Sequence, residues 1–448
     1  MSDTARLWGT QTALAIDNFP IAKRPLDVRV AHALATIKRH AAVVNAGLGT
    51  AGVDDDMAEA IGVVAWRVES GELDAAFPVD VYQTGSGTST NMNVNEVIAG
   101  LASNSLGQAV HPNDHVNASQ SSNDVVPTAI RLALIRELVG HTHPALALLV
   151  AALRSLSERT MSMVKAGRTH LMDATPVTIG QEVDAWAGLV ERALARSVAD
   201  VAALGELPLG GTAVGTGINA PEGFADAVVA SIAAETGFAV RTTPNPMVHM
   251  GGQGALAEAS SGLRAVAVAL TKVANDIRLL ASGPAAGLGE LLLPELQAGS
   301  SIMPGKVNPV LCESVNQVAA RVMGNDVTVG FAASQGILEL NTYLPVMADA
   351  VLESATLLGN VAAVFADRCV AGITVDEART RGYAERTSAL ATALNPIIGY
   401  ERAAAIVHTA LDSGRSIIDV VVDEGVLPAE EARRVLDPLR AAGVTDAD

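Results

Sequence analysis

The sequence predicts an all-α fold, and two observations support this prediction. Long stretches rich in Ala, Val and Leu place apolar residues at helical spacing. No internal repeat and no period-2 strand pattern of any length interrupts them. Hydrophobic residues make up 49% of the 448-residue chain, but aromatic residues only 3%. Helices that are apolar on more than one face are usually buried on more than one side. This favours a homo-oligomer built through helix bundles over a single large all-α core.

The periodicity predicts successive helices along most of the chain. Pro127 is tolerated only in a first turn, so its helix must begin close to Ser121, Ser122 or Asn123. Thr175 followed by Pro176 predicts a cap and a first helical residue, opening a helix that runs to about residue 203. The other helices are expected over residues 27–48, 56–70, 125–160, 221–236, 254–280, 309–329, 343–365, 375–390, 400–413, 416–424 and 428–442.

Composition and charge exclude several classes of function. The net charge of −18 disfavours nucleic-acid or anionic-membrane partners. No run of 18 apolar residues lacks a charge, so no transmembrane helix is expected. Residues Met1–Arg6 lack the basic and apolar regions of a signal peptide. Two cysteines, Cys312 and Cys369, cannot form a disulfide framework, which is typical of a reducing cytoplasm. We therefore expect a cytoplasmic protein that binds neither nucleic acid nor membrane.

Four polar segments interrupt the apolar stretches, and each is expected at a helix N-terminus: residues 83–93, 111–124, 167–175 and 299–309. The unpaired N–H groups and the dipole at such an end suit an anionic ligand. Any one segment alone could be an ordinary loop or a capped turn. Together they offer hydroxyls, amides, one cation (Lys306), one histidine in a short loop (His170) and one carboxylate (Glu313). Neither Cys/His metal spacing nor a nucleotide fingerprint is present. This chemistry suits a small, multiply anionic substrate.

The segment GSSIMPGKVNP, residues 299–309, is the most unusual of the four. Gly299 and Gly305 allow backbone angles that other residues avoid, so the segment between them can move or fold tightly. Asn308 followed by Pro309 predicts a helix N-cap and first helical position. A flexible loop with hydroxyls and a cation is therefore expected to run directly into a helix N-terminus.

The same four segments resemble, in order and at similar separation, those of the fumarase/aspartase superfamily. Residues Gly299 to Asn308 match its G-S-S-x-x-P-x-K-x-N signature without a break. Class II fumarases carry Thr-His where this chain has Thr169-His170, whereas aspartases carry Thr-Gln. The segment GGTAVGTG at residues 210–217 also resembles the fumarase version. Argininosuccinate and adenylosuccinate lyases differ more widely in the first two segments. The resemblance indicates a class II fumarase, with an aspartase-like C–N lyase as the alternative.

The resemblance implies a three-domain fold with a long central helix bundle that tetramerises. The implied domains are an N-terminal helical domain (1–120), the central bundle (121–372) and a small C-terminal helical domain (373–448). A change in composition near Gly372 agrees with the second boundary. In this family each active site is built from three chains of a homotetramer.

The implied activity is the reversible hydration of fumarate to L-malate, by anti addition and elimination through an aci-carboxylate intermediate. The alternative is conversion of aspartate to fumarate and ammonia. Ser300 would be the base at C3, and His170 paired with Glu313 would handle the water. No metal or organic cofactor is implied. The implied substrate-binding residues are Ser86, Thr88, Ser121, Ser122, Asn123, Thr169, Ser301, Lys306 and Asn308.

The chain departs from the family pattern at several places. A second anion site, at His111, Pro112, Asn113 and Asp114, is common in the family, but an Arg upstream of it in some members has no counterpart here. His115 stands where many fumarases have Asp, and Leu14 replaces a common Arg. Residues 245–250 differ from the usual P-N-x-F-E run. A binding protein on a lyase fold is a further alternative, against which the presence of Ser300, His170 and Lys306 argues.

Overall fold

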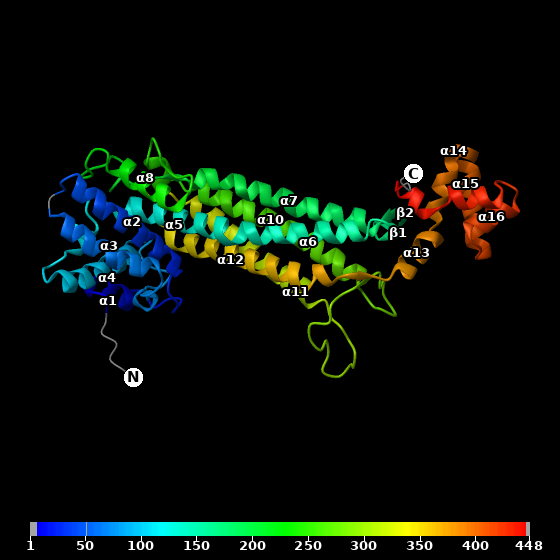
Figure 1. The fold of residues 1–448 in the computed structure, drawn as a ribbon, viewed down its shortest axis with the longest axis horizontal. Helices are drawn as coiled ribbons and strands as arrows, with labels where there is room; N and C mark the ends of the chain where they lie inside the picture. The colour runs from blue at the N-terminus through cyan, green and yellow to red at the C-terminus, as the bar shows by residue number, and fades with distance from the viewer. Residues whose placement is uncertain (1–6, 51, 445–448) are drawn as a thin grey trace. The chain divides into compact units, whose positions relative to one another are not determined.

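The computed structural model describes residues 7–50 and 52–444 of the chain. Helices dominate these residues (Figure 1). The strands among these residues form three two-stranded sheets. This confirms the all-α prediction. The expectation about a signal peptide at Met1–Arg6 lies outside the described residues.

The helices of the first 280 residues are α1 (Thr10–Asn18), α2 (Val28–Gly47), α3 (Asp55–Glu69), η1 (Asp74–Ala76), α4 (Thr88–Leu106), η2 (Pro112–Val116), α5 (Ser122–Glu137), η3 (Leu138–Thr142), α6 (His143–Arg159), α7 (Ile179–Leu204), α8 (Phe224–Thr236), α9 (Met247–Met250) and α10 (Gly254–Leu280). The remaining helices are α11 (Val310–Ala333), α12 (Leu344–Arg368), η4 (Val370–Gly372), α13 (Glu377–Arg386), η5 (Ser388–Leu394), α14 (Asn395–Ile398), α15 (Tyr400–Ser413), α16 (Ile417–Asp423), α17 (Ala429–Val435) and α18 (Pro438–Ala441). The strands are β1 (Val164–Thr169), β2 (Met172–Thr178), β3 (Glu206–Leu207), β4 (Arg241–Thr242), β5 (Leu291–Leu292) and β6 (Thr374–Val375).

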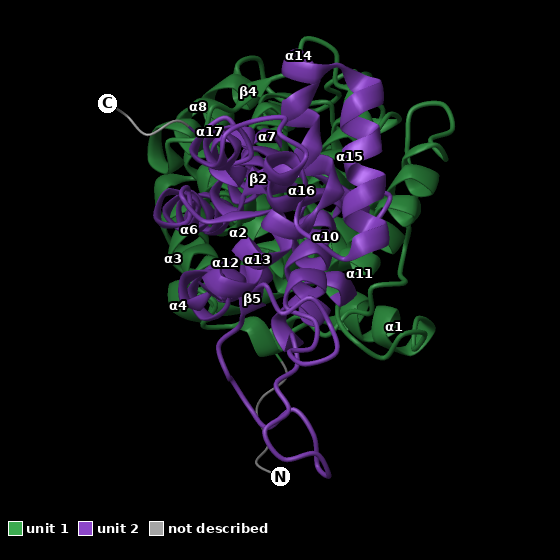
Figure 2. Cartoon of the chain, turned by 90° about the vertical axis from the view of Figure 1, so that its right-hand side faces the viewer, with its two compact units in different colours: residues 1–144, 193–267, 318–359 green, residues 145–192, 268–317, 360–448 purple. Residues whose placement is uncertain are grey.

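The chain divides into two compact units, each assembled from three stretches that are distant in sequence (Figure 2). Unit 1 contains residues 1–144, 193–267 and 318–359, and unit 2 contains residues 145–192, 268–317 and 360–448. The boundaries fall inside α6, α7, α10, α11 and α12. The three-domain partition at 120/121 and 372/373 follows sequence order instead, and it stays a prediction.

In unit 1, α2 is the helix around which the N-terminal elements pack. Asp27 caps it by accepting a hydrogen bond from the Arg29 N–H group at 3.0 Å. Leu34 and Ile37 are completely buried, and α3, α4, α5 and α8 all pack against α2. Such a helix needs apolar residues on several faces, which explains why Ala and Val make up half of its residues.

The long helices of unit 1 are also joined by hydrogen bonds between polar side chains and their neighbours. Asp326 of α11 accepts hydrogen bonds from Ser260 Oγ at 2.8 Å and Arg264 Nη1 at 2.7 Å, both on α10. Asn325 donates to the Ala350 carbonyl of α12 at 3.2 Å. These bonds fix the axial register of the helices, because apolar packing alone constrains it less.

Unit 2 contains the β1–β2 hairpin and the C-terminal helices. α13 packs on β1, while η5 and α18 pack on β2. Trp186 of α7 donates its indole N–H group to Asp276 of α10 at 2.9 Å. η5, α15, α16 and α17 share a separate hydrophobic cluster, in which Leu394, Ile406, Val420 and Leu436 are completely buried.

The hairpin corrects the prediction of a helix opened by Thr175 and Pro176. Both residues lie in β2, and α7 begins at Ile179. Thr178 caps α7 instead: its hydroxyl accepts from the Gln181 N–H group and the Gln181 side chain accepts from the Thr178 N–H group, both at 3.0 Å. The first four residues of β1 are all buried, so this strand shows no period-2 alternation in the sequence. The segment at residues 167–175 is therefore not at a helix N-terminus.

Two helix starts also differ from expectation. Pro127 is the sixth residue of α5, beyond the first turn, although the helix begins beside Ser121 as expected. The missing N–H group of Pro127 costs one hydrogen bond close to the helix end. α11 begins at Val310, so Pro309 precedes the helix, and Asn308 does not cap it. The Asn308 amide instead donates to the Gly299 carbonyl at 2.6 Å.

Within the described residues, one helical segment has the length and composition of a membrane span. It covers Leu344–Gly372, with a mean hydropathy of 1.3 in its most apolar window. Core helices pass the same test, and 61% of this window is buried inside the structure. The burial favours a core helix.

Candidate active site

In unit 1, the loop before α4 and the first residue of α4 present two of the predicted substrate-binding hydroxyls. Ser86 Oγ and Thr88 Oγ1 lie 2.8 Å apart. A Cβ atom on Gly85 would overlap the Thr342 carbonyl, and one on Gly87 would lie 2.7 Å from Val126 Cγ1. Gly87 also has a left-handed φ of 75°. The glycines are therefore required for the close approach that positions the hydroxyls.

The second group of predicted binding residues lies at the start of α5. Ser121 and Asp124 form a capping box, in which Asp124 Oδ1 accepts from the Ser121 N–H group at 2.9 Å. Ser122 Oγ accepts from Asn91 Nδ2 at 3.2 Å. Asn123 Nδ2 donates to the Ala213 carbonyl at 2.8 Å. Helix capping and these contacts together fix the backbone of Ser121–Asn123.

A cavity of about 470 Å³ in unit 1 includes Ser121 and two residues of the predicted second anion site, Asn113 and Asp114. His111 Nδ1 accepts from the Asp114 N–H group at 3.1 Å. The cavity is also lined by Asn117, Gln120, Ser119, Thr212 and Asn219, which the sequence reasoning missed. The amide-rich run at residues 111–124 was the available signal for the first three.

The departure at residues 245–250 has a clear structural setting in unit 1. His249 of α9 lies between Arg131 Nη2 (3.1 Å from Nδ1) and Glu206 Oε2 (3.2 Å from Nε2). Burial and then Arg131 lower the pKa of His249, while Glu206 opposes them. A Cβ atom on Gly211 would meet Pro246 and Met250. Residues 245–250 therefore support the 210–217 loop, which in turn contacts Asn123.

In unit 2, the 299–309 loop is closed at its base by its own backbone. The Gly299 N–H group donates to the Lys306 carbonyl at 2.9 Å, and Asn308 Nδ2 donates to the Gly299 carbonyl. The loop extends from the helices between α10 and α11 (Figure 1). Ser300 Oγ accepts hydrogen bonds from the N–H groups of Ile302 at 3.2 Å and Met303 at 3.0 Å. Two donors on one hydroxyl oxygen are the arrangement that stabilises an alkoxide.

Lys306, Asn308 and Glu313 come together around a cavity of about 460 Å³ in unit 2. Arg278 of α10 also lines this cavity and was missed from the sequence, because its helix carries no polar segment there. Ser300 and Ser301 lie in the same loop but outside the lining of the cavity. Lys306 is exposed, and within the described residues it forms no ion pair.

His170 occupies the tip of the β1–β2 hairpin. His170 and Leu171 form its two-residue turn with φ values of 56° and 61°, a left-handed conformation that non-glycine residues rarely adopt. Such strain persists where the surrounding structure enforces it, often at functional sites. Thr169, His170 and Leu171 are all exposed in the single chain. His170 and Glu313 form no hydrogen bond with each other within one chain.

A buried ion cluster anchors the hairpin, and the sequence reasoning missed it. Glu290, which is completely buried, accepts from Arg168 at 2.7 and 3.0 Å. Lys165 Nζ lies 2.8 Å from Glu182 Oε2 and 3.7 Å from Glu290 Oε2. Arg168 also lies over the Tyr383 ring at 5.8 Å. Because Arg168 immediately precedes Thr169 and His170, this cluster fixes the strand that presents them.

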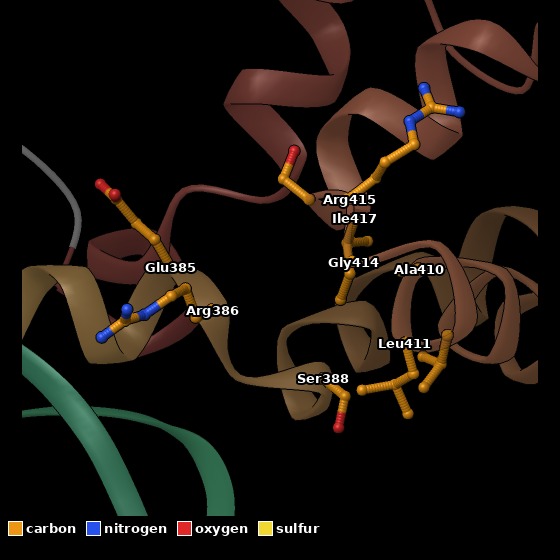
Figure 3. Close-up of a pocket in the computed structure, with 10 residues that line it drawn as sticks. Glu385, Arg386, Ser388, Ala410, Leu411, Gly414, Arg415 and Ile417 are labelled. Atoms are coloured by element: carbon orange, nitrogen blue, oxygen red, sulfur yellow. The ribbon is translucent and has the colours of Figure 1, made fainter.

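A third cavity, of about 410 Å³, lies among the C-terminal helices (Figure 3). Its two arginines are engaged elsewhere: Arg386 donates to the Gly382 carbonyl and stacks on Tyr383, while Arg415 pairs with Asp423. Figure 3 shows both guanidinium groups directed away from Ser388 and Leu411. None of the predicted site residues lines this cavity, so it is not the candidate active site.

No group of three or more His, Cys, Asp or Glu side chains within residues 7–50 and 52–444 is placed to hold a metal ion.

Comparison with known proteins identifies the family of this chain. A model of the lyase family matches residues 2–324, and a model of the fumarase C C-terminus matches residues 390–440. The class II fumarate hydratase of Mycobacterium tuberculosis is 48% identical over 99% of this chain and 94% of its own length. That of Xylella fastidiosa is 48% identical over 96% of this chain and 91% of its own length. The crystal structure of class II fumarase from Schistosoma mansoni aligns with a TM-score of 0.94 and 35% identity, covering 98% of this chain and 96% of that one. The chain therefore belongs to the class II fumarate hydratase family of lyases.

Proposed function

We propose that this protein is a hydro-lyase that hydrates fumarate reversibly to L-malate. Family membership supports the reaction, and one observation carries the mechanism. Ser300 Oγ accepts two backbone N–H groups in a loop that also holds Lys306 and Asn308. An ordinary serine hydroxyl is far too weak a base for a carbon acid, so it needs such activation.

Ser300, as the alkoxide, removes the C3 proton of malate. The adjacent carboxylate then becomes a dianionic aci-acid, and its stabilisation makes the step feasible. Lys306 supplies positive charge to the substrate carboxylates, and Asn308 supplies an amide donor. The hydroxyls and amides of Ser86, Thr88, Ser121, Ser122, Asn123, Thr169 and Ser301 complete the set of substrate-binding groups.

His170 acts as the general acid and base for the water at C2, on the face opposite Ser300. Glu313 of another chain orients its imidazole. The elimination is therefore anti. The exposure of His170 in the single chain, with no bond to its own Glu313, supports this assignment to different chains.

The active site is shared by three chains of a homotetramer. Exposed apolar side chains on the long helices support oligomerisation, among them Leu148, Val198, Val268, Val327 and Phe331. Dissociated chains should be inactive, and an active monomer would refute the shared site.

The second anion site and the cytoplasmic location remain proposals. At the second anion site, Asn113 and Asp114 line a cavity. The Asp114 carboxylate beside His111 disfavours binding of an anionic ligand there unless His111 is protonated. For the cytoplasmic location, both cysteines are free and buried, as in proteins of a reducing compartment.

The test compares the wild type with Ser300→Ala, using the exposed Ser413→Ala as the matched control. Fumarate formation from L-malate is followed by absorbance. Loss of the base should lower kcat by a factor of about 10² to 10⁴, while the control keeps full activity and both variants keep the tetramer. Unchanged turnover of Ser300→Ala would refute its role as the base.

The same assay with aspartate tests the alternative of a C–N lyase. Fumarate formed from aspartate and not from L-malate would refute the proposed reaction.

A further inference from the structure

We propose that Lys38 is a positioning residue, whose buried ammonium group holds the segment that presents Ser121, Ser122 and Asn123 to the substrate. This inference rests on the proposed substrate-binding function of those three residues. Lys38 lies on α2, and its side chain is completely buried.

The ammonium group holds the turn that directly precedes Ser121. Lys38 Nζ donates to Asn117 Oδ1 at 2.6 Å and to Gln120 Oε1 at 3.1 Å. Asn117 Nδ2 donates in turn to the Gln120 carbonyl at 3.2 Å. Both ends of the 117–120 turn are therefore tied to one charged group.

The same network reaches the other group of substrate-binding residues in unit 1. Asn117 Oδ1 also accepts from Asn91 Nδ2 at 3.1 Å and from Asn95 Nδ2 at 3.3 Å, both on α4. Asn91 Nδ2 lies 3.2 Å from Ser122 Oγ. Because α4 begins at Thr88, Lys38 and Asn117 couple the positions of the first and second binding segments.

Asp124 is the countercharge of this network. It is completely buried, and it accepts from the N–H groups of Ser121, Gly210 and Thr212, each at 2.9 Å. Burial raises the pKa of Asp124 to about 6, while its three backbone donors and Lys38 oppose the shift. Burial lowers the pKa of Lys38 to about 7, and Asp124 opposes this shift. As pH rises through about 7, the ammonium loses its proton and the turn loses its charged anchor.

Other charged side chains on the elements packed against α2 are engaged away from Lys38. Glu69 of α3 and Glu235 of α8 bind Arg39, and Glu69 also binds Arg136 of α5. Arg131 of α5 donates to the Glu206 carbonyl. Glu96 of α4 caps α1, and Asp114 and His115 of η2 contact His111.

Stability alone does not explain this network. Asn91 Oδ1 and Asn95 Oδ1 are buried without a hydrogen-bond partner, and a buried ammonium group is costly to desolvate. A cluster that is unfavourable in these ways, directly behind the binding residues, is expected to be retained for function.

The test measures kcat and KM for L-malate against pH in wild type, Lys38→Met, Lys38→Arg and Asn117→Asp. Lys23→Met, at an exposed lysine, is the matched control. Lys38→Met should raise KM at least tenfold at neutral pH with a smaller change in kcat. Asn117→Asp places a carboxylate beside the ammonium group and keeps it protonated to higher pH. Arginine stays charged throughout. The fall of kcat/KM at alkaline pH, the alkaline limb of the pH profile, should therefore shift to higher pH by about one unit or more in Lys38→Arg and Asn117→Asp.

Identical alkaline limbs in wild type, Lys38→Arg and Asn117→Asp would overturn the inference. So would a Lys38→Met protein that is only less stable, with unchanged KM. If Lys38→Met does not fold, the other two variants decide. A wild type inactive on both fumarate and L-malate would refute the proposed function and this inference together, whereas an active wild type with unmoved limbs refutes the inference alone.

Discussion

Replacing Glu290 by Gln should destabilise the protein and impair catalysis through the hairpin that carries His170. Glu290 and its neighbours Lys165, Arg168 and Glu182 contain two positive and two negative charges, so the substitution leaves a net charge of +1. The Glu290 and Lys165 side chains are only 0% and 2% exposed, so solvent screens this charge little. Breaking a buried ion pair by removing one partner costs about 3–5 kcal/mol. Since Lys165 keeps Glu182 as a partner, we expect Glu290→Gln to lower the free energy of unfolding by about 3 kcal/mol, the lower end of this range.

The measurement is urea unfolding at one fixed protein concentration, together with L-malate turnover. The double variant Arg168→Met/Glu290→Met removes both partners of the ion pair. Its loss of unfolding free energy should therefore be about 1–3 kcal/mol smaller than the sum of the losses in the two single variants. Glu191→Gln is the control, because Glu191 is exposed in its pair with Arg154 and should change stability by less than about 1 kcal/mol.

The position of Arg168 directly before Thr169 and His170 predicts the effect of Glu290→Gln on the kinetics. Arg168 immediately precedes Thr169 and His170, so loosening its anchor should lower kcat more than it raises KM. A Glu290→Gln protein that unfolds within about 0.5 kcal/mol of wild type, with unchanged kcat, would refute the reasoning.

Two further predictions concern a glycine and a thiol. Gly87→Ala should raise KM and lower stability by about 2–4 kcal/mol, because its Cβ would lie 2.7 Å from Val126 Cγ1 at a φ of 75°. Gly107→Ala has a similar φ of 69° but open space around it, so urea unfolding should show only the conformational cost of about 1–2 kcal/mol; equal losses would contradict the contact argument. The pKa of the Cys312 thiol is raised by its contact with Cys369 and by burial, so a thiol reagent should label neither cysteine in the native protein and both in urea. Rapid native labelling would contradict the burial of this pair.

The family could be read from the sequence because it depends on short local patterns, and the same patterns predicted the residues of the candidate site. Helical periodicity located most helices to within a few residues, since an amphipathic helix places an apolar residue on its buried face every three to four positions. The polar segments drew attention to Lys306 and His170, and the resemblance of residues 299–308 to the family signature proposed a role for Ser300. Where two local signals conflicted, as at Thr175-Pro176, the cap-and-proline rule gave a helix and the structure has a strand.

Only the tertiary structure identified the groups that support these residues. Lys38, Asp124, Lys165 and Glu290 are ordinary charged residues in the sequence, and nothing beside them predicts their burial. Most of their partners lie far away in the chain, so the shifted pKa values of Lys38 and Asp124 and the ion pairs of Lys165 and Glu290 exist only after the chain has folded. The sequence determined the family and the segments that carry the proposed site residues, whereas long-range packing decided what holds those residues in place, because desolvation and pairing depend on neighbours that are distant in the chain.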